Sequence, residues 1–216
     1  MRKNRITKVM GTVSATLAIT ISAFAAISGG VFSERAQPKA GGVLAFNEIK
    51  PVVGGLYLPF TMATYNPALC GLNRVSVSKY VGPDSKESDT KVLVLNFFAS
   101  YCESCKKEMD DIISLYERHN KNGFMAMSVG IDAEKEGIDW VTNYVEQKRI
   151  KYPVIRDEKN ILMKRYGVEN VPVTFVINKA GKVIGHFTEY NEETHKKLEK
   201  LIYDELGLAA EKKTGT

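Results

Sequence analysis

The fold of this chain is decided by residues 92–109, which read VLVLNFFASYCESCKKEM. The first seven of these residues are apolar at every position except Asn96, so both faces of the segment are apolar. A short run of this kind is typical of a strand that is buried on both sides in the middle of a sheet. We therefore expect a central strand over residues 92–98, with the pair Cys102 and Cys105 shortly after it.

The sequence that follows alternates between strand and helix patterns, which is typical of an α/β domain with a central sheet. Apolar residues recur at helical spacing after the cysteines, and a turn at residues 179–182 separates two short apolar runs. The expected elements are a helix over about 102–118, a strand over 123–131, a helix over 134–149, a short helix over 158–166, strands over 173–178 and 183–187, and a helix over about 191–206 that ends at Gly207.

The N-terminus has the pattern of an export signal. Basic residues lie among the first eight, and residues 9–27 carry no charge. Residues 23–25 (AFA) offer a cleavage site, yet the apolar stretch is nearly long enough to span a bilayer. Residues 1–30 are therefore expected to be either a signal peptide or a retained membrane anchor.

We divide the rest of the chain into a linker with an N-terminal extension over residues 31–66 and a folded domain over residues 67–210. The linker is rich in Gly, Pro and Ala, and its short apolar runs indicate short strands or a hairpin. Residues 74–80 alternate apolar residues with serines, which predicts a strand that pairs at an edge.

Composition excludes two classes of protein. Of the 216 residues, 44% are hydrophobic and 25% are charged, which is typical of a globular domain and not of a disordered or multi-pass membrane protein. The formal net charge is +5, but most of it comes from the basic residues before the apolar stretch. No basic stripe interleaved with aromatic residues follows, so we expect no nucleic-acid partner.

Two of the three cysteines have the spacing Cys102-x-x-Cys105 at the start of the expected helix. The free N–H groups at a helix N-terminus lower the pKa of a cysteine from about 8.5 to roughly 3.5–7.5, which supplies the thiolate that disulfide exchange needs. Cys102 is the expected nucleophile, and the more buried Cys105 is expected to resolve a mixed disulfide. A structural disulfide and a metal site are the alternatives, although a four-ligand zinc site needs a second pair of cysteines.

Residues 95–109 resemble the active-site segment of the TlpA/ResA family of membrane-anchored, thioredoxin-like proteins. A second motif, VPVTFVINKAGKV at residues 171–183, is similar to the segment in which that fold places a cis-proline. The resemblance covers roughly residues 92–206. It implies a thioredoxin-like α/β fold, in which helices flank a central mixed sheet, with an N-terminal β-hairpin extension and an inserted helix.

The resemblance also implies a substrate-binding loop. Pro172 is implied to be the cis-proline that faces the cysteine pair, and Val171 to contact a bound polypeptide through its backbone. Tyr101, just before the first cysteine, is implied to contact the same polypeptide. An ordinary trans proline that opens a strand is the alternative for Pro172.

Glu108 matches an acidic position of the family that tunes the cysteines and shuttles protons. Asn96 stands where ordinary thioredoxins carry a buried aspartate, so a carboxylate near the pair is needed to accept the proton of Cys105. Glu108 lies three residues beyond Cys105, within one helical turn. The alternative is a surface glutamate that faces Lys106 or Lys107.

The chain departs from the family at Tyr101, Ser104 and Val173, where tryptophan, proline and threonine are usual. Residues around the cysteines set the reduction potential, so the direction of electron transfer stays open. Cys70 lies before the core of the fold and matches no family position. As an odd cysteine it is expected to be free or buried, to pair between molecules, or to act as a third redox thiol.

A copper chaperone of the same fold is the alternative function, with Cys102, Cys105 and His186 as ligands. Three residues usually separate the cysteines of such proteins, and His186 is more simply an exposed strand residue, as His119 and His195 are surface residues of helices. A peroxiredoxin-type peroxidase needs a threonine-rich approach to its cysteine. An inactive scaffold that keeps only the fold does not need the cysteine pair, the proline and the acidic residue together. Their joint presence therefore disfavours this alternative.

These observations predict a bacterial thiol–disulfide oxidoreductase that is exported to the periplasm or to the extracytoplasmic face of the inner membrane. Its expected partners are envelope proteins that carry a disulfide or a dithiol. The resemblance adds apocytochrome c cysteines as substrates and a membrane thiol donor upstream. We expect no cofactor and no resident metal.

Overall fold

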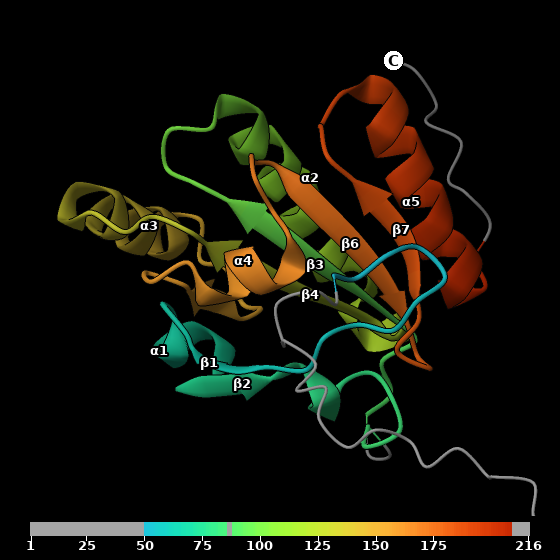
Figure 1. Cartoon of the computed structure of the whole chain (residues 1–216). Helices are drawn as coiled ribbons and strands as arrows, with labels where there is room; N and C mark the ends of the chain where they lie inside the picture. Colours follow the sequence, from blue (N-terminus) through green and yellow to red (C-terminus); the bar gives the residue numbers. More distant parts are fainter. Residues whose placement is uncertain (1–49, 86–87, 209–216) are drawn as a thin grey trace, which may run out of the picture. The chain divides into compact units, whose positions relative to one another are not determined.

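The computed structural model of this chain describes residues 50–85 and 88–208 (Figure 1). The expectations for residues 1–30 and for most of the linker lie outside these residues. Within the described ranges, no helix combines the length and the apolar character that crossing a bilayer requires.

Five strands form the expected mixed sheet, in the spatial order β5-β4-β3-β6-β7. The central strand β3 pairs in parallel with β4 and antiparallel with β6, while β5 adds in parallel to β4 and β7 antiparallel to β6. The strands are β3 (Val92–Phe98), β4 (Phe124–Gly130), β5 (Val154–Arg156), β6 (Val173–Asn178) and β7 (Val183–Phe187). The predicted strands therefore occur where the apolar runs placed them.

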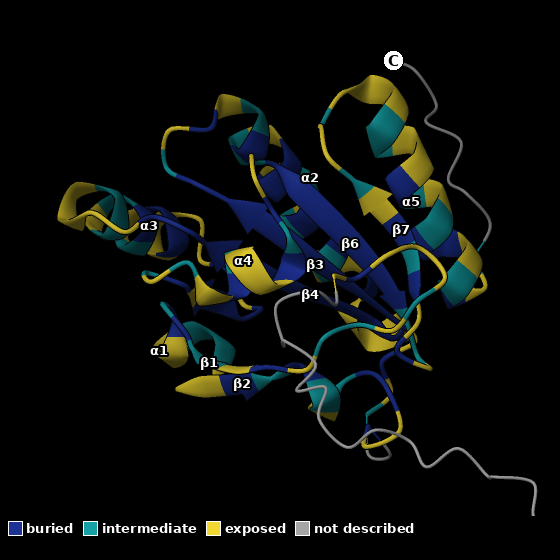
Figure 2. Ribbon diagram, viewed as in Figure 1, coloured by how far each residue is buried: buried dark blue, intermediate teal, exposed yellow. Residues whose placement is uncertain are grey.

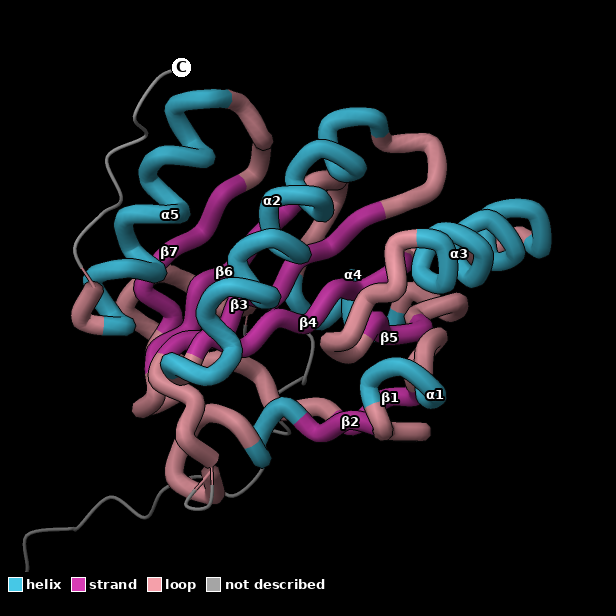
Figure 3. The backbone as a smooth tube through the Cα atoms, turned by 180° about the vertical axis from the view of Figure 1, so that it is seen from behind, coloured by secondary structure: helices cyan, strands magenta, loops and turns pink. Residues whose placement is uncertain are grey.

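Helices cover both faces of this sheet because β3 is apolar on both. Val92 and Val94 point into one buried cluster with helices α2 (Glu103–His119) and α5 (Glu192–Leu206), which lie together over one face in Figure 3. Leu93 points into the opposite cluster, which includes residues of α4 (Ile161–Tyr166). Figure 2 shows the sheet as the most completely buried part of the fold.

Helix α3 (Lys135–Gln147) follows β4. Its apolar stripe, Val141 and Val145, joins the cluster beneath α2. Trp140 stacks on Tyr144 with ring centroids 4.8 Å apart, so these rings pack against the fold as expected.

The helix predicted over 158–166 is shorter in the structure, because α4 begins only at Ile161. Asn160 has a left-handed backbone (φ 53°), which no helix continues. The buried carboxylate of Asp157 accepts the free N–H groups of Ile161, Leu162 and Met163 at 2.8–3.1 Å. These bonds fix the start of the helix.

The prediction of a strand over residues 74–80 is wrong beyond Ser76. Strand β2 (Arg74–Ser76) pairs antiparallel with β1 (Thr61–Ala63) in a separate two-stranded sheet, with the short helix α1 (Pro67–Cys70) between them. Residues Val77–Lys79 then form a 3₁₀ turn. The N–H groups of Tyr80 and Val81 close this turn on the carbonyl of Val77 at 3.0 and 3.3 Å, and Val77 and Val81 are both fully buried.

Residues 31–66 were expected to contain short strands or a hairpin; the short strand β1 lies there, but the described residues before it form no hairpin of their own. Gly54, Gly55 and Tyr57 hydrogen bond to the β6–β7 hairpin instead, for example from the N–H of Gly54 to the carbonyl of Val183 at 2.8 Å. Val52 and Val53 remain exposed. The antiparallel pair of the extension is therefore β1, inside residues 31–66, and β2, which lies beyond them.

Candidate active site

Cys102 and Cys105 form a disulfide at the N-terminus of α2, with their Cα atoms 5.2 Å apart. Cys102 is the residue that caps the helix, and its sulfur accepts the backbone N–H of Cys105 at 3.2 Å. Cys102 is 8% exposed and Cys105 is fully buried. The structure thus confirms the helix N-terminus and the greater burial of the second cysteine.

The residues around Cys102 are more polar than the usual family segment. The hydroxyl of Ser104, where proline is usual, lies 3.6 Å from the Cys102 sulfur. A hydroxyl at this position adds a donor for a thiolate beside the helix N–H groups. Tyr101 is 75% exposed, so its ring is accessible to another molecule.

The peptide bond between Val171 and Pro172 is cis, as the resemblance implied. Pro172 is buried and Val171 is half-buried. Strand β6 begins directly afterwards, and its register places Val173 opposite Phe97, near the end of β3. The loop that carries the proline and the loop that carries the cysteines therefore meet at the same end of the central sheet.

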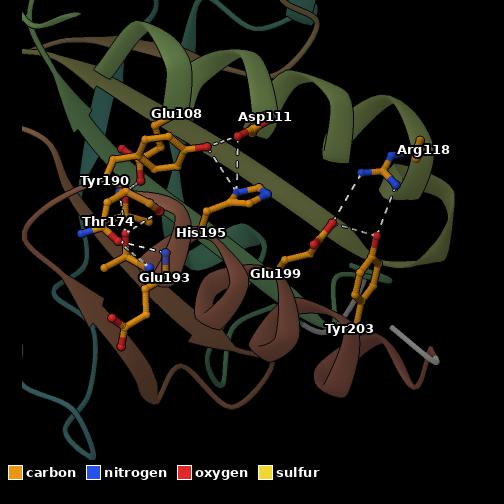
Figure 4. A network of polar contacts seen from close by, with 11 residues as sticks. Glu108, Asp111, Arg118, Thr174, Tyr190, Glu193, His195, Glu199 and Tyr203 are labelled. Carbon is orange, nitrogen blue, oxygen red and sulfur yellow. Dashed lines mark hydrogen bonds and ion pairs between the residues drawn. The ribbon is translucent and has the colours of Figure 1, made fainter. Parts of the chain in front are cut away.

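Glu108 lies inside the molecule, so the alternative of a surface glutamate is wrong. It is 2% exposed, and its two carboxylate oxygens accept hydrogen bonds from Asn96 Nδ2 at 2.8 Å and from Thr174 Oγ1 at 2.7 Å. Figure 4 shows Glu108 and Thr174. Burial raises the pKa of Glu108 to about 7, although both hydrogen bonds oppose the shift. A carboxyl group one turn after Cys105 therefore gains and loses a proton near neutral pH.

Thr174 completes this group and was not predicted. Register places it directly across from Asn96, whose amide also donates to its hydroxyl at 3.0 Å. The sequence contained one signal, since Thr174 follows the proline motif in an otherwise apolar strand. The structure thus holds Glu108 between two neighbouring strands.

A family model described as Redoxin matches residues 83–202, which is more than half of the chain. The chain belongs to the Redoxin family. The match includes the disulfide, the cis-proline and Glu108.

Curated relatives of this redoxin are named for disulfide chemistry. It is 34% identical over 117 residues to the thiol-disulfide oxidoreductase ResA of Bacillus thuringiensis subsp. konkukian, which is 54% of this chain and 65% of that protein. It is 27% identical over 90 residues to the sporulation thiol-disulfide oxidoreductase A of Bacillus subtilis, covering 42% and 54% of the two chains. The redoxin thus spans less than two thirds of the length of each relative. The similarity to ResA confirms the family resemblance.

Solved structures show the same fold. A candidate thiol:disulfide interchange protein DsbE from Chlorobium tepidum has a TM-score of 0.61 at 23% identity, over 73% of this chain and all of that one. A thioredoxin-family interchange protein from Chlorobium tepidum TLS has a TM-score of 0.56 at 20% identity, over 72% and 99%. At these identities the likeness concerns the fold alone, which is thioredoxin-like as expected.

The histidines of the redoxin lie apart from the cysteines. His186 is exposed on β7 and stacks on Phe175 with ring centroids 4.4 Å apart. In the described part of the chain, no three His, Cys, Asp or Glu side chains are grouped so that they could hold a metal ion. The structure therefore does not bring His186 to Cys102 and Cys105 as the copper alternative requires.

The expectation that His119 and His195 are surface residues is wrong for the first and incomplete for the second. His119 is buried, with its ring edge-on to Tyr203. His195 is half-buried, and its Nδ1 lies 3.3 Å from both Asp111 and the Tyr190 hydroxyl, which itself bonds to Asp111 (Figure 4). These contacts join α5 to α2.

Cys70 is a free, half-buried thiol at the end of α1. Its sulfur lies 3.5 Å from the carbonyl oxygen of Leu72, which accepts a weak hydrogen bond. It forms no disulfide with Cys102 or Cys105, which are bonded to each other.

Asp132 is the second polar residue that the sequence reading missed. It follows β4, is 7% exposed, and accepts hydrogen bonds from Ser100, two residues before Cys102. The available signal was its position, because an acidic residue directly after a buried strand lies at the end of the sheet where the cysteine loop also begins.

Proposed function

We propose that this redoxin is an exported thiol–disulfide oxidoreductase that exchanges disulfides with envelope proteins through Cys102 and Cys105. The observation that carries the proposal is the disulfide between these residues at the N-terminus of α2, with the buried Glu108 one turn behind it. The names of the curated relatives support the same chemistry.

In the reducing direction, the Cys102 thiolate attacks one sulfur of a partner's disulfide, and the other partner sulfur leaves as a thiolate. The N–H of Cys105 and the helix N-terminus stabilise the Cys102 thiolate before attack. Cys105 then attacks the Cys102 sulfur, which forms the Cys102–Cys105 disulfide and releases the partner's second thiol. The partner gains two electrons from the cysteine pair and two protons from solvent, while the pair gives up one proton when Cys102 ionises and one from Cys105.

Glu108 serves as the proton acceptor for Cys105 in this second step. A group with a pKa of about 7 is well matched to that task at neutral pH. Its carboxylate is held by Asn96 and Thr174, so it stays on the Cys105 side of the helix when the disulfide opens. In the oxidising direction the same group returns the proton.

The substrate surface is formed by Tyr101 and by the loop of Val171 and Pro172. Tyr101 is exposed beside Cys102, and the proline loop lies at the same end of the sheet. The proposed partners are envelope proteins with a disulfide or a dithiol, including apocytochrome c, and a membrane thiol donor completes the cycle. The N-terminal basic and apolar stretches support export and either cleavage or anchoring.

Trapping tests this function. Cys105→Ser leaves Cys102 able to attack but removes the resolving thiol, so mixed disulfides with envelope proteins are expected to accumulate and to disappear on reduction. The matched control is Cys102→Ser, which removes the nucleophile, and both variants carry Cys70→Ser to exclude the third thiol. The proposal is contradicted if Cys102 reacts with small disulfides but traps no envelope protein.

A further inference from the structure

The loop that presents Cys102 is held from one side by a single carboxylate. Asp132 Oδ2 accepts the backbone N–H of Ser100 at 3.0 Å, and its Oδ1 accepts the Ser100 hydroxyl at 2.6 Å. Ser100 lies in the turn between β3 and α2, where the N–H of Cys102 bonds to the carbonyl of Ala99 at 3.1 Å. Asp132 therefore fixes the residue from which the chain turns into the capping position of α2.

The sheet brings Asp132 to this place. Strands β3 and β4 run in parallel with Phe98 opposite Gly130, and the N–H of Ile131 bonds to the carbonyl of Phe98 at 3.1 Å. Both chains leave the sheet at the same end, so the residue after Ile131 lies beside the residue after Ala99. Asp132 is 7% exposed, and its bonds to the half-buried Ser100 are partly buried.

The first turn of α3 packs closely against the same carboxylate. A Cβ atom at Gly137, in the first turn of α3, would overlap Asp132 Oδ1 and would lie 2.8 Å from the Asp132 Cβ. Because the Asp132 Cβ is itself too close, rotating the side chain does not relieve this contact. A residue without a side chain is needed at position 137 to leave Asp132 where it reaches Ser100.

We propose that Asp132 is a positioning residue for disulfide exchange, which holds the Ser100 turn so that the Cys102 sulfur stays at the N-terminus of α2. This inference rests on the proposed function of the cysteine pair. It adds a residue outside the pair, the proline loop and the Glu108 group, and it gives α3 a role in the chemistry through Gly137.

Asp132 can affect the Cys102 pKa through its charge or through the position of the loop, and replacing Asp132 changes that pKa in opposite directions in the two cases. A negative charge near Cys102 disfavours its thiolate, so loss of charge alone lowers the Cys102 pKa. Loss of the anchor weakens the bond from the Cys105 N–H to the Cys102 sulfur, which raises the pKa. The sign of the shift therefore distinguishes the two effects.

The test compares three variants in the full chain: Asp132→Ala, Asp132→Asn and Gly137→Ala. The readouts are the Cys102 pKa from thiolate absorbance, the rate of the reduced protein with a small aromatic disulfide, and thermal unfolding. Asp132→Ala is expected to raise the Cys102 pKa by about one unit, a tenfold change in the ionisation constant of the thiol. Asp132→Asn keeps an acceptor for the Ser100 N–H and is expected to stay within about threefold of the native rate.

Gly137→Ala keeps every polar group but displaces the Asp132 carboxylate. We therefore expect it to change the Cys102 pKa and the exchange rate in the same direction as Asp132→Ala. Asp139→Ala is the matched control, because it removes an exposed acid of α3 that pairs with Lys135 and is expected to match the native protein. The inference is overturned if Asp132→Ala and Gly137→Ala both leave the pKa and rate unchanged, or if Asp132→Asn shifts the pKa as far as Asp132→Ala.

The role of Asp132 stays testable if one variant fails to fold. If Asp132→Ala unfolds, Gly137→Ala still tests the position of the carboxylate. If the native Cys102 has an ordinary thiol pKa and exchanges no disulfide, the proposed function itself fails, and this outcome is read from the native protein alone.

Discussion

Two buried carboxylates, Glu108 and Asp132, lie near the cysteine pair, and they are held in different ways. Glu108 lies under the sheet-facing side of α2, and both of its hydrogen bonds come from side chains, Asn96 and Thr174. Asp132 lies at the end of β4 and binds a backbone N–H as well as the Ser100 hydroxyl. The side-chain bonds of Glu108 allow its carboxyl group to gain and lose a proton, whereas the bonds of Asp132 fix the backbone at Ser100.

The largest expected effect comes from placing a second carboxylate beside Glu108. Asn96→Asp replaces the amide that donates to Glu108, and Asn96 Oδ1 accepts no hydrogen bond from the described residues. Two adjacent buried acids share one proton, so the variant is expected to lose about 3–5 kcal/mol above neutral pH and less in acid. Urea unfolding at about pH 5 and about pH 8 measures this difference.

An equal loss at both pH values would contradict the placement of Asn96 against the Glu108 carboxylate. Asn178→Asp, on the same strand pair but only half-buried, is the matched control. Its stability is expected to change by less than about 0.5 kcal/mol.

Glu108→Gln tests the proton-exchanging carboxylate directly. Its pKa of about 7 in the folded state exceeds the ordinary value of 4.5, so between these values the folded chain binds a proton that the unfolded chain has lost. The free energy of unfolding of the native protein is therefore expected to fall by about 3 kcal/mol as pH rises through this window. The variant is expected to lack this fall, because glutamine has no proton to release.

The same variant is expected to slow resolution of the mixed disulfide by about tenfold to a hundredfold near neutral pH, since Cys105 loses its proton acceptor. Stopped-flow measurement with a partner disulfide separates this step from the attack by Cys102. A native pH profile in the variant would show that Glu108 takes no part in proton transfer.

Thr174→Val keeps the shape of the side chain and removes one donor to Glu108. Loss of that bond is expected to raise the Glu108 pKa further and to cost about 1–2 kcal/mol where the carboxyl is ionised. Titration of the carboxyl by NMR gives the shift. Thr142→Val, whose hydroxyl bonds to a helix carbonyl, is the control and is expected to leave Glu108 unchanged.

Ser100→Ala has the smallest expected effect, because it removes the hydroxyl bond to Asp132 but keeps the backbone N–H. The loss of stability is expected to be about 1 kcal/mol, with the same size at every pH between about 5 and 8. Denaturant unfolding across that range checks it. A pH-dependent loss like that of Thr174→Val would remove the distinction between the two carboxylates.

The sequence predicted the fold where the pattern is local. The strand at 92–98 and the hairpin at 173–187 were correct because apolar runs and turn residues determine such elements. The helix at 102–118 was correct to within one residue, since its cap is a cysteine in the motif itself. The prediction of a strand at residues 77–79 was wrong, because the burial of Val77 and Val81 depends on distant parts of the chain.

The site was predicted only as far as motifs reach. Cys102, Cys105, Pro172 and Glu108 lie in two recognisable segments. Thr174 and Asp132 act through the pairing of β3 with β6 and with β4, and no local pattern specifies which residues that register brings together.

The central claim is that Cys102 and Cys105 form a reversible disulfide that exchanges with other proteins. Equilibration of the Cys70→Ser protein with glutathione buffers, followed by transfer of electrons to a model protein disulfide, tests it most directly. We predict a reduction potential between about −270 and about −120 mV, with one disulfide reduced per cysteine pair and no transfer by Cys102→Ser. A disulfide that does not equilibrate with the buffers, or electron transfer that persists without Cys102, would contradict the account.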